Sequence, residues 1–301
     1  MSEPLVYVNG EFVSKSKATV SVFDHGLLYG DGVFEGIRAY GGIVFRLDDH
    51  VERLFNSAKV IHLEISMTKH ETAEAILETL RRNQLRDAYI RVVVTRGTGD
   101  LGVDPALCKA PTVFIIVEPA KSALGLEAPR VVSLIIASVR RDPVDGTSHE
   151  VKSLNYLNSI LAKMEAGRAG ADDALMLDHR GFVSETSVAN VFAVKDNRVF
   201  TPSGSAGILH GITRARMIRL CSDLGLDVEE KDVTPFELLT ADEVFTVGTK
   251  SELLAVGAIN GTKIGTGTAG PLARRLLHEF GKVVQRREEG TAVYEAESVN
   301  L

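Results

Sequence analysis

A lysine stands at position 152 in a short polar block, His149-Glu150-Val151-Lys152-Ser153-Leu154-Asn155-Tyr156, just before a stretch with helical periodicity. A lysine between an extended segment and a helix start can be held partly out of water. Its amine can then attack an aldehyde or act as a general base. Most lysines are solvated surface residues, so this position alone leaves both interpretations open.

Two further blocks carry groups that would complement such an amine. Glu185, in Glu185-Thr186-Ser187-Val188-Ala189-Asn190, offers a carboxylate, although on its own it is more typical of a solvated residue after a hairpin. Gly211-Ile212-Thr213 stands where a helix through Met217 and Ile218 should begin. The amides of a helix N-terminus, with a threonine hydroxyl, bind phosphate groups, but a plain threonine cap explains this block equally well.

Two glycine-rich stretches match the G-x-G-x-x-G pattern of dinucleotide-binding turns, but neither has the surroundings that this function needs. Gly97 to Gly102 runs into Val103-Asp104-Pro105, where the phosphate-binding helix should begin. Gly265 to Gly270 precedes a helix that no apolar second strand follows. The histidines form no H-E-x-x-H motif and no serine lies in a G-x-S-x-G elbow, so neither a metal site nor a hydrolase triad is predicted.

The composition is typical of a compact globular protein. The chain has 301 residues, of which 45% are hydrophobic and 25% charged, which argues against disorder. Its formal net charge of −6 gives no basic field for nucleic acid or an anionic membrane, so neither partner is expected. The first residues lack the pattern of a targeting signal and no run is apolar enough to span a bilayer, so we expect a cytoplasmic protein. Cys108 and Cys221 form no CxxC pair, which argues against a disulfide scaffold.

Hydrophobic periodicity predicts the elements that carry these blocks. Strands are expected at residues 5–8 and 11–13, joined by Asn9-Gly10, and at 89–95, 112–117, 131–139, 174–177, 190–194, 199–200 and from 243. Helices are expected at 50–60 with Asp48 or Asp49 as the cap, through Ala75, Ile76 and Leu80 to about Asn83, at 155–168, from Thr213 and from Pro271. In the helix at 155–168, one face carries Leu157, Ile160, Leu161 and Met164. Because strands and helices interleave irregularly, the predicted class is α+β.

The stretch from Glu118 to Pro129 is rich in proline, glycine and small residues, which is typical of a linker between domains. We therefore expect a small N-terminal α/β domain over residues 1–120, a linker over 121–129 and a large C-terminal domain over 130–301.

Taken in order, the three blocks closely resemble the class IV aminotransferases, pyridoxal-phosphate enzymes that include branched-chain and D-amino-acid aminotransferases and aminodeoxychorismate lyase. The stretch from Asp24 to Arg38 and the pair Phe45-Arg46 also resemble that family, so the similarity covers nearly the whole chain. The resemblance implies a two-domain fold of type IV, similar to D-amino-acid aminotransferase, in which the larger C-terminal domain is a pseudo-barrel. It also implies pyridoxal 5′-phosphate as the cofactor.

The resemblance assigns roles around that cofactor. Lys152 would hold it as a Schiff base and act as the catalytic acid and base, and Glu185 would face the protonated ring nitrogen. Tyr156 would contact the phenolic oxygen. The phosphate would be bound by Arg46, Ile212, Thr213 and Thr249.

For the substrate, Tyr89-Ile90-Arg91 resembles a Tyr-x-Arg of the branched-chain members, in which the arginine is linked to the distal carboxylate of glutamate. The implied activity is ping-pong transamination between a branched-chain L-amino acid and 2-oxoglutarate. Other implied substrate-binding residues are Tyr29, Phe34, Arg38, Val103 and Lys250. The loop from Gly99 to Val103 resembles one that reaches a neighbouring subunit's site, which implies a homodimer or a higher homo-oligomer. Lys250 and Val188 depart from the family, which commonly has a small residue and a glycine at those positions.

Several alternatives stay open. Aminodeoxychorismate lyase would share the cofactor but would have no need of Arg91. Thr95-Arg96-Gly97 also resembles the D-amino-acid and (R)-amine transaminases. A non-catalytic binding protein, or a dehydrogenase built on the glycine-rich turns, would lack the cofactor altogether.

Overall fold

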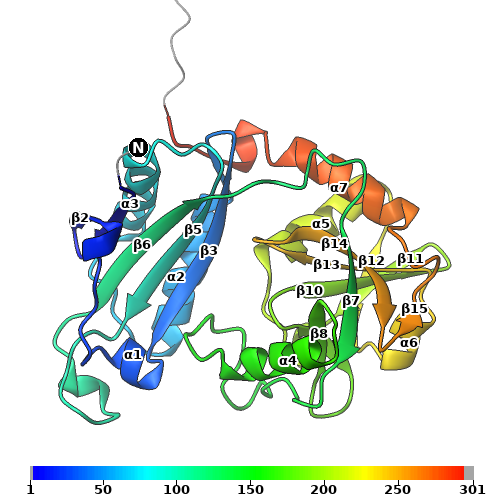
Figure 1. Ribbon diagram of the computed structural model, residues 1–301, viewed down its shortest axis with the longest axis horizontal. Helices are drawn as coiled ribbons and strands as arrows, with labels where there is room; N and C mark the ends of the chain where they lie inside the picture. Colours follow the sequence, from blue (N-terminus) through cyan, green and yellow to red (C-terminus); the bar gives the residue numbers. More distant parts are fainter. Residues whose placement is uncertain (1–2, 295–301) are drawn as a thin grey trace, which may run out of the picture. The chain divides into compact units, whose positions relative to one another are not determined.

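The computed structural model describes residues 3–294, which form two compact units (Figure 1). Among these residues, the first unit comprises 3–122, Val151–Leu154 and 283–294, and the second comprises Ala123–Glu150 and Asn155–Lys282. The first unit gives way to the second within the stretch expected to be the linker. Val151–Leu154 and the segment after Val283, which the sequence placed in the C-terminal domain, group with the first unit. No helix within residues 3–294 has the length and apolar character that a membrane span requires.

A seven-stranded sheet, in the order β16-β4-β3-β5-β6-β1-β2, forms the basis of the first unit. Its strands are β1 (Leu5–Val8), β2 (Glu11–Ser14), β3 (Gly32–Tyr40), β4 (Ile43–Phe45), β5 (Ala88–Thr95), β6 (Thr112–Pro119) and β16 (Gly290–Ala292). The predicted hairpin between β1 and β2 is confirmed. Asn9 and Gly10 have φ angles of 47° and 96°, in the left-handed region that a tight two-residue turn requires.

Two long helices, α2 (Leu47–Val60) and α3 (Lys69–Arg82), cover one face of this sheet, and both appear beside its strands in Figure 1. The shared core includes Val33, Ile37, Ile90 and Val92 from the strands and Val51, Leu54, Ile76 and Leu80 from the helices. The unit also has α1 (His25–Tyr29) and the short 3₁₀ helices η1 (Lys15–Lys17), η2 (Pro105–Leu107) and η4 (Arg287–Glu289).

The predicted start of α2 is wrong by several residues. The N-cap is Arg46, with a left-handed φ of 50°, rather than Asp48 or Asp49. Both aspartates lie in the first turn, where their charges interact favourably with the helix dipole.

The second unit contains a nine-stranded sheet in the order β12-β11-β10-β13-β14-β7-β8-β9, with β15 added beside β14. Its strands are β7 (Val131–Ile136), β8 (Asp173–Leu177), β9 (Val183–Thr186), β10 (Asn190–Lys195), β11 (Arg198–Pro202), β12 (Val228–Lys231), β13 (Glu243–Gly248), β14 (Glu252–Ile259) and β15 (Thr262–Lys263). The sheet curls, because β9 at its end contacts β10 and β11 near the other end. This curled sheet, with the helices around it, confirms the predicted α+β class and pseudo-barrel.

The helices of this unit are α4 (Leu157–Arg168), α5 (Ile212–Asp223), α6 (Pro235–Leu239) and α7 (Pro271–Val283), with η3 (Gly204–Ala206). Helix α4 packs on β8 through Ser159, Ala162 and Ala166, small residues that allow a close approach. The predicted stripe of large apolar residues is real but faces outward: Leu157, Ile160, Leu161 and Met164 are between 41% and 66% exposed.

Candidate functional site

Lys152 lies in a short segment that is bound along β3 of the first unit. Its backbone nitrogen donates to the Ser57 hydroxyl of α2 at 3.1 Å, and its carbonyl accepts from the Phe34 amide at 3.0 Å. Leu154 then donates to the Gly32 carbonyl at 2.9 Å. The backbone is thus fixed on both sides, and the Lys152 Nζ lies 4.5 Å from the centre of the Phe34 ring.

Four of the residues expected to bind the substrate, namely Phe34, Arg38, Tyr89 and Arg91, lie on one face of the same sheet. In the β3–β5 register Gly36 pairs with Arg91 and Arg38 pairs with Tyr89, so with Phe34 they share a face. The Arg91 guanidinium carbon lies 4.1 Å from the centre of the Phe34 ring, which the Lys152 amine also approaches. The structure therefore places Phe34, Arg38, Tyr89 and Arg91 on one face, where the Phe34 ring also lies against the Lys152 amine.

Because Gly36 has no side chain, it leaves room for the Tyr89 phenol on this face. A Cβ at Gly36 would lie 2.3 Å from the Tyr89 hydroxyl oxygen, well inside contact distance. Burial raises the pKa of Tyr89, so this hydroxyl remains a hydrogen-bond donor at neutral pH.

Tyr29 and Val103 belong to a separate part of the first unit, where α1 meets the loop after β5. The Gly102 amide donates to the Tyr29 hydroxyl at 2.9 Å, and a ring nitrogen of His25 lies 2.9 Å from the Asp100 carbonyl. These contacts hold the loop, yet Leu101 and Val103 at its tip are 71% and 82% exposed.

On the opposite face of β3, which packs on α2, a buried cluster of charges lies beneath the lysine segment. Arg53 donates to both oxygens of the Glu35 carboxylate, from Nε to Oε1 at 2.6 Å and from Nη2 to Oε2 at 3.0 Å. His50 Nδ1 donates to Oε2 of the same carboxylate at 2.8 Å. Burial opposes ionisation of Glu35, but the charge of Arg53 and the hydrogen bonds hold its pKa well below the usual range. Burial lowers the pKa of His50, and the positive charges of Arg53 and Lys152 act in the same direction.

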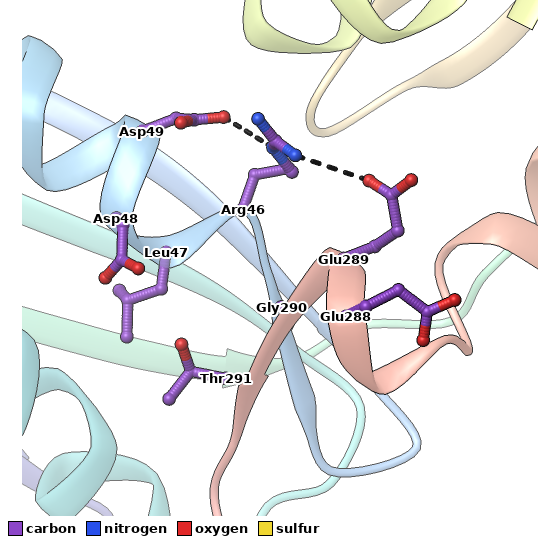
Figure 2. Close-up of a pocket in the computed structure, with 8 residues that line it drawn as sticks. All are labelled: Arg46, Leu47, Asp48, Asp49, Glu288, Glu289, Gly290 and Thr291. Atoms are coloured by element: carbon purple, nitrogen blue, oxygen red, sulfur yellow. Dashed lines mark hydrogen bonds and ion pairs between the residues drawn. The ribbon is translucent and has the colours of Figure 1, made fainter.

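Arg46, expected at the phosphate, lies in a different setting (Figure 2). Its Nη1 lies 3.4 Å from Glu289 Oε2, and its Nε lies 2.5 Å from Asp49 Oδ2. Both ion pairs are marked by dashed lines in Figure 2. The surrounding cavity, of about 210 Å³, is lined by Arg46, Leu47, Asp48, Asp49, Glu288, Glu289, Gly290 and Thr291. One cation among four carboxylates leaves a negative local field, which disfavours a phosphate.

In the second unit, Asn190 links Glu185 to the start of α5. Its side-chain amide donates at 2.9 Å both to Glu185 Oε2 and to the Leu209 carbonyl. A Cβ at Gly211, the N-cap of α5, would lie 2.1 Å from the Asn190 side-chain oxygen, so a larger residue at this cap would displace the Asn190 amide. The first turn of α5 has no side-chain cap and no acidic residue, which leaves the amides near Ile212 and the buried Thr213 suited to an anion.

The remaining predicted residues of the second unit lie at a helix start and in a turn. Tyr156 is the N-cap residue of α4, and the centres of its ring and the His149 ring are 6.3 Å apart, with the ring planes at 71°. Thr249 and Lys250 form the turn between β13 and β14, where Thr249 is half-buried and Lys250 exposed.

Comparison with known proteins identifies the family. The model of the family described as amino-transferase class IV matches residues 32–259. The chain belongs to this family. A putative branched-chain-amino-acid aminotransferase of Methanocaldococcus jannaschii is 49% identical to it over 96% of this chain and 99% of that protein.

Solved structures of class IV aminotransferases extend the similarity to the fold. The T.th. branched-chain amino acid aminotransferase with pyridoxamine 5′-phosphate matches with a TM-score of 0.93 at 41% identity, over 98% of this chain and all of that one. The same enzyme with N-(5′-phosphopyridoxyl)-L-glutamate matches with a TM-score of 0.90 at 40% identity and the same coverage. The type IV fold predicted from the sequence is therefore confirmed.

The groups that this class IV aminotransferase presents fit a phosphorylated pyridine cofactor. Such a cofactor needs an amine for its aldehyde, an anionic acceptor for its ring nitrogen, and amide and hydroxyl donors for its phosphate. Lys152 offers the first of these. Glu185, 5% exposed, offers the second, and the uncapped start of α5 offers the third.

Three polar residues near Lys152, namely Glu35, His50 and Arg53, were not singled out by the sequence. The signal was present in the spacing, because His50, Arg53 and Ser57 recur at i, i+3 and i+7 beside the apolar stripe of α2. Glu35 was also the one carboxylate in the otherwise apolar run Gly32 to Ile37.

Proposed function

We propose that the chain is a pyridoxal-phosphate-dependent branched-chain amino acid aminotransferase. It would transfer the amino group between a branched-chain L-amino acid and 2-oxoglutarate in two half-reactions. The observation that carries this proposal is the meeting of the Lys152 amine and the Arg91 guanidinium on the Phe34 ring, at 4.5 and 4.1 Å. A reactive amine, a fixed cation and an aromatic wall are what an amino acid with either an apolar or an anionic side chain requires.

When bound, pyridoxal phosphate supplies the electron sink for the charge that develops at the substrate's α-carbon. Lys152 Nζ would hold the cofactor through its aldehyde carbon, and the same amine would remove and return the substrate's α-proton. Glu185 would accept a hydrogen bond from the ring N–H, and the Asn190 side-chain amide and the Leu209 backbone amide, at 2.9 and 3.3 Å, fix the Glu185 Oε2 oxygen. Tyr156 is assigned to the phenolic oxygen.

For the phosphate we propose Ile212, Thr213 and Thr249, with Arg53 in place of Arg46. Two observations support the exchange. Arg46 already interacts with two carboxylates in an acidic cavity, whereas Arg53 and Lys152 both act on His50 and so share one neighbourhood. The Glu35 carboxylate would orient the Arg53 guanidinium through its Nε and Nη2 donors.

The exchange predicts a difference between two arginine variants. Arg53→Lys should weaken pyridoxal 5′-phosphate binding about tenfold or more, because a lysine cannot reproduce the two-pronged geometry. Arg46→Met should leave it unchanged. The measurement is cofactor titration of the apoenzyme, repeated with pyridoxal, which lacks the phosphate. A loss in Arg53→Lys that is equally large for pyridoxal would contradict a phosphate contact.

For the substrate, Arg91 is assigned to the distal carboxylate of glutamate, and Phe34, Tyr89 and Tyr29 to the apolar wall. Arg38 is 3% exposed and its Nη2 donates to the Lys121 carbonyl at 3.2 Å, so its role would be to support this wall. Lys250 is exposed and would lie near the α-carboxylate. The exposed Leu101 and Val103 support a homodimer in which this loop reaches the partner's site.

We further propose that the protein is located in the cytoplasm and that residues 121–129 form the linker between its two domains.

Gly36→Ala tests the packing of Tyr89. The new methyl group would meet the phenol, and because the far end of a side chain can move, stability should change by less than about 1 kcal/mol. The displaced Tyr89 should lower kcat/KM for L-leucine about tenfold, the range typical of one methylene in a pocket. Gly167→Ala is the control, since a Cβ there meets nothing within 4 Å. Unchanged kcat/KM in Gly36→Ala would show that the phenol does not shape the pocket.

The function is tested with a donor panel. L-leucine, L-isoleucine and L-valine with 2-oxoglutarate should give rapid turnover, and D-alanine and (R)-1-phenylethylamine should not. Arg91→Met should raise the KM for 2-oxoglutarate far more than the KM for L-leucine. Rapid turnover only with D-alanine, or release of pyruvate from aminodeoxychorismate without transamination, would replace the proposal with one of the alternatives.

A further inference from the structure

Arg141, just after β7 in the second unit, is the largest of the fully buried side chains among residues 3–294, with 1% of the side chain exposed. A buried guanidinium is costly unless its charge is balanced and its donors are bonded. Its Nε makes no hydrogen bond in the structure. The groups around its other two nitrogens therefore indicate what it stabilises.

One guanidinium nitrogen of Arg141 lies against the strand that carries Glu185. Nη2 donates to the Thr186 carbonyl at 2.8 Å and lies 3.4 Å from Glu185 Oε1. The other carboxylate oxygen, Oε2, accepts from Asn190 and from the Leu209 amide, which are neutral donors. Arg141 thus places a full positive charge beside a carboxylate whose Oε2 is held by uncharged donors.

The second nitrogen of Arg141 binds the start of α4. Nη1 donates to Ser159 Oγ at 3.1 Å and to Asn158 Oδ1 at 3.4 Å. It also lies 3.3 and 3.4 Å from the two ring nitrogens of His149, whose Nε2 is 3.0 Å from Asp142. These bonds to two elements fix the guanidinium independently of Glu185.

We propose that Arg141 is a positioning residue for transamination, acting through Glu185 as the fixed countercharge that holds this carboxylate ionised and oriented toward the cofactor's ring nitrogen. The inference rests on the proposed function. The geometry suits this role better than a closed ion pair would. A two-pronged pair would occupy both carboxylate oxygens, whereas a 3.4 Å approach to one oxygen supplies charge and leaves hydrogen-bonding capacity for a ring N–H.

A double-mutant cycle on cofactor binding separates this role from a purely structural one. Apoenzymes of the unchanged chain, Arg141→Met, Glu185→Gln and the double variant are titrated with pyridoxal 5′-phosphate, and their thermal midpoints are recorded. If Arg141 acts through the Glu185 charge, Arg141→Met should weaken binding about tenfold in the unchanged background and less than about twofold beside Glu185→Gln. That difference is a coupling of about 1 kcal/mol. Arg141→Lys, which keeps the charge, should retain more affinity than Arg141→Met.

Arg216→Met is the matched control, because Arg216 is 7% exposed in the same unit and pairs with Asp223 at 3.5 Å. It should lower the thermal midpoint without changing cofactor affinity in either background. Equal weakening by Arg141→Met in both backgrounds would overturn the inference, and so would equal affinities of Arg141→Lys and Arg141→Met. If Arg141→Met does not fold, the same cycle is run with Arg141→Gln, which removes the charge but can still donate hydrogen bonds, and with the same criterion. Failure of the unchanged chain to bind pyridoxal 5′-phosphate would overturn the proposed function instead.

Discussion

Replacing Lys152 by alanine is expected to abolish transamination and leave the fold intact. The segment is held by its backbone, through the Ser57 hydroxyl and the Phe34 amide, and these bonds do not depend on the side chain. In the proposed function the amine would serve both as the covalent attachment point and as the proton carrier, so kcat should fall at least about 10⁴-fold. The measurements are kcat with L-leucine and 2-oxoglutarate, and the thermal midpoint of the apoenzyme.

Lys163→Ala is the control for the loss of a lysine. Lys163 lies on α4 with 55% of its side chain exposed and pairs with Asp173 at 3.4 Å. It should keep full turnover. Borohydride reduction of the holoenzyme, followed by peptide mass analysis, should place the cofactor on the peptide that contains Lys152. Undiminished turnover in Lys152→Ala, or labelling of another lysine, would refute the assignment.

Elements with strong local signals were predicted correctly. The Asn9-Gly10 hairpin is specified by residues that tolerate positive φ, and α3 ends at the Asn83 cap as expected. The start of α2 depends on tertiary contacts instead. Arg46 adopts its left-handed cap conformation where its amide bonds the Glu289 carbonyl at 2.9 Å, more than two hundred residues along the chain. No local pattern encodes that contact.

Helix α4 shows a second limit of periodicity. The sequence correctly placed four large apolar residues on one face, but a period cannot tell which face is buried. The structure buries the stripe of Ser159, Ala162 and Ala166, because small side chains let the helix approach β8 closely. The size of the side chains, more than their hydrophobicity, therefore decides which face of α4 is buried.

In the candidate site too, residues with a local sequence signal were predicted and residues defined by tertiary contacts were not. Lys152, Glu185 and Gly211-Ile212-Thr213 stood out because each belongs to a block with chemically distinct neighbours. Arg141 did not, since Arg140-Arg141-Asp142 resembles an ordinary surface turn until the fold shows it buried beside Glu185. Long-range ion pairs join residues with no sequence relation, so they become visible only in three dimensions.

Of the variants proposed for this protein, Glu35→Gln is expected to lower the free energy of unfolding the most. Glu35 is fully buried and its carboxylate is shared by Arg53 and His50, so neutralising it leaves the Arg53 guanidinium, 14% exposed, without its countercharge. Removing one partner of a buried pair costs about 3 kcal/mol or more. His50, whose pKa is lowered by burial, is neutral and donates its Nδ1 hydrogen, and it cannot replace the missing negative charge.

The pH dependence of the Glu35→Gln effect is the sharper measurement. Because the folded-state pKa of Glu35 is depressed below the ordinary value of 4.5, its contribution is fully present above that pH and is lost as the pH falls. The difference in unfolding free energy between the wild-type chain and the variant, measured with urea, should be constant from pH 8 to about pH 5 and shrink below about 4.5. Glu52→Gln is the control. This carboxylate lies on α2, the helix that carries Arg53, is 52% exposed and pairs with Lys69, so its loss should change nothing resolvable. A difference for Glu35→Gln that stays constant down to pH 3, or one no larger than that of Glu52→Gln, would mean that the buried charge does not hold Arg53 beneath Lys152.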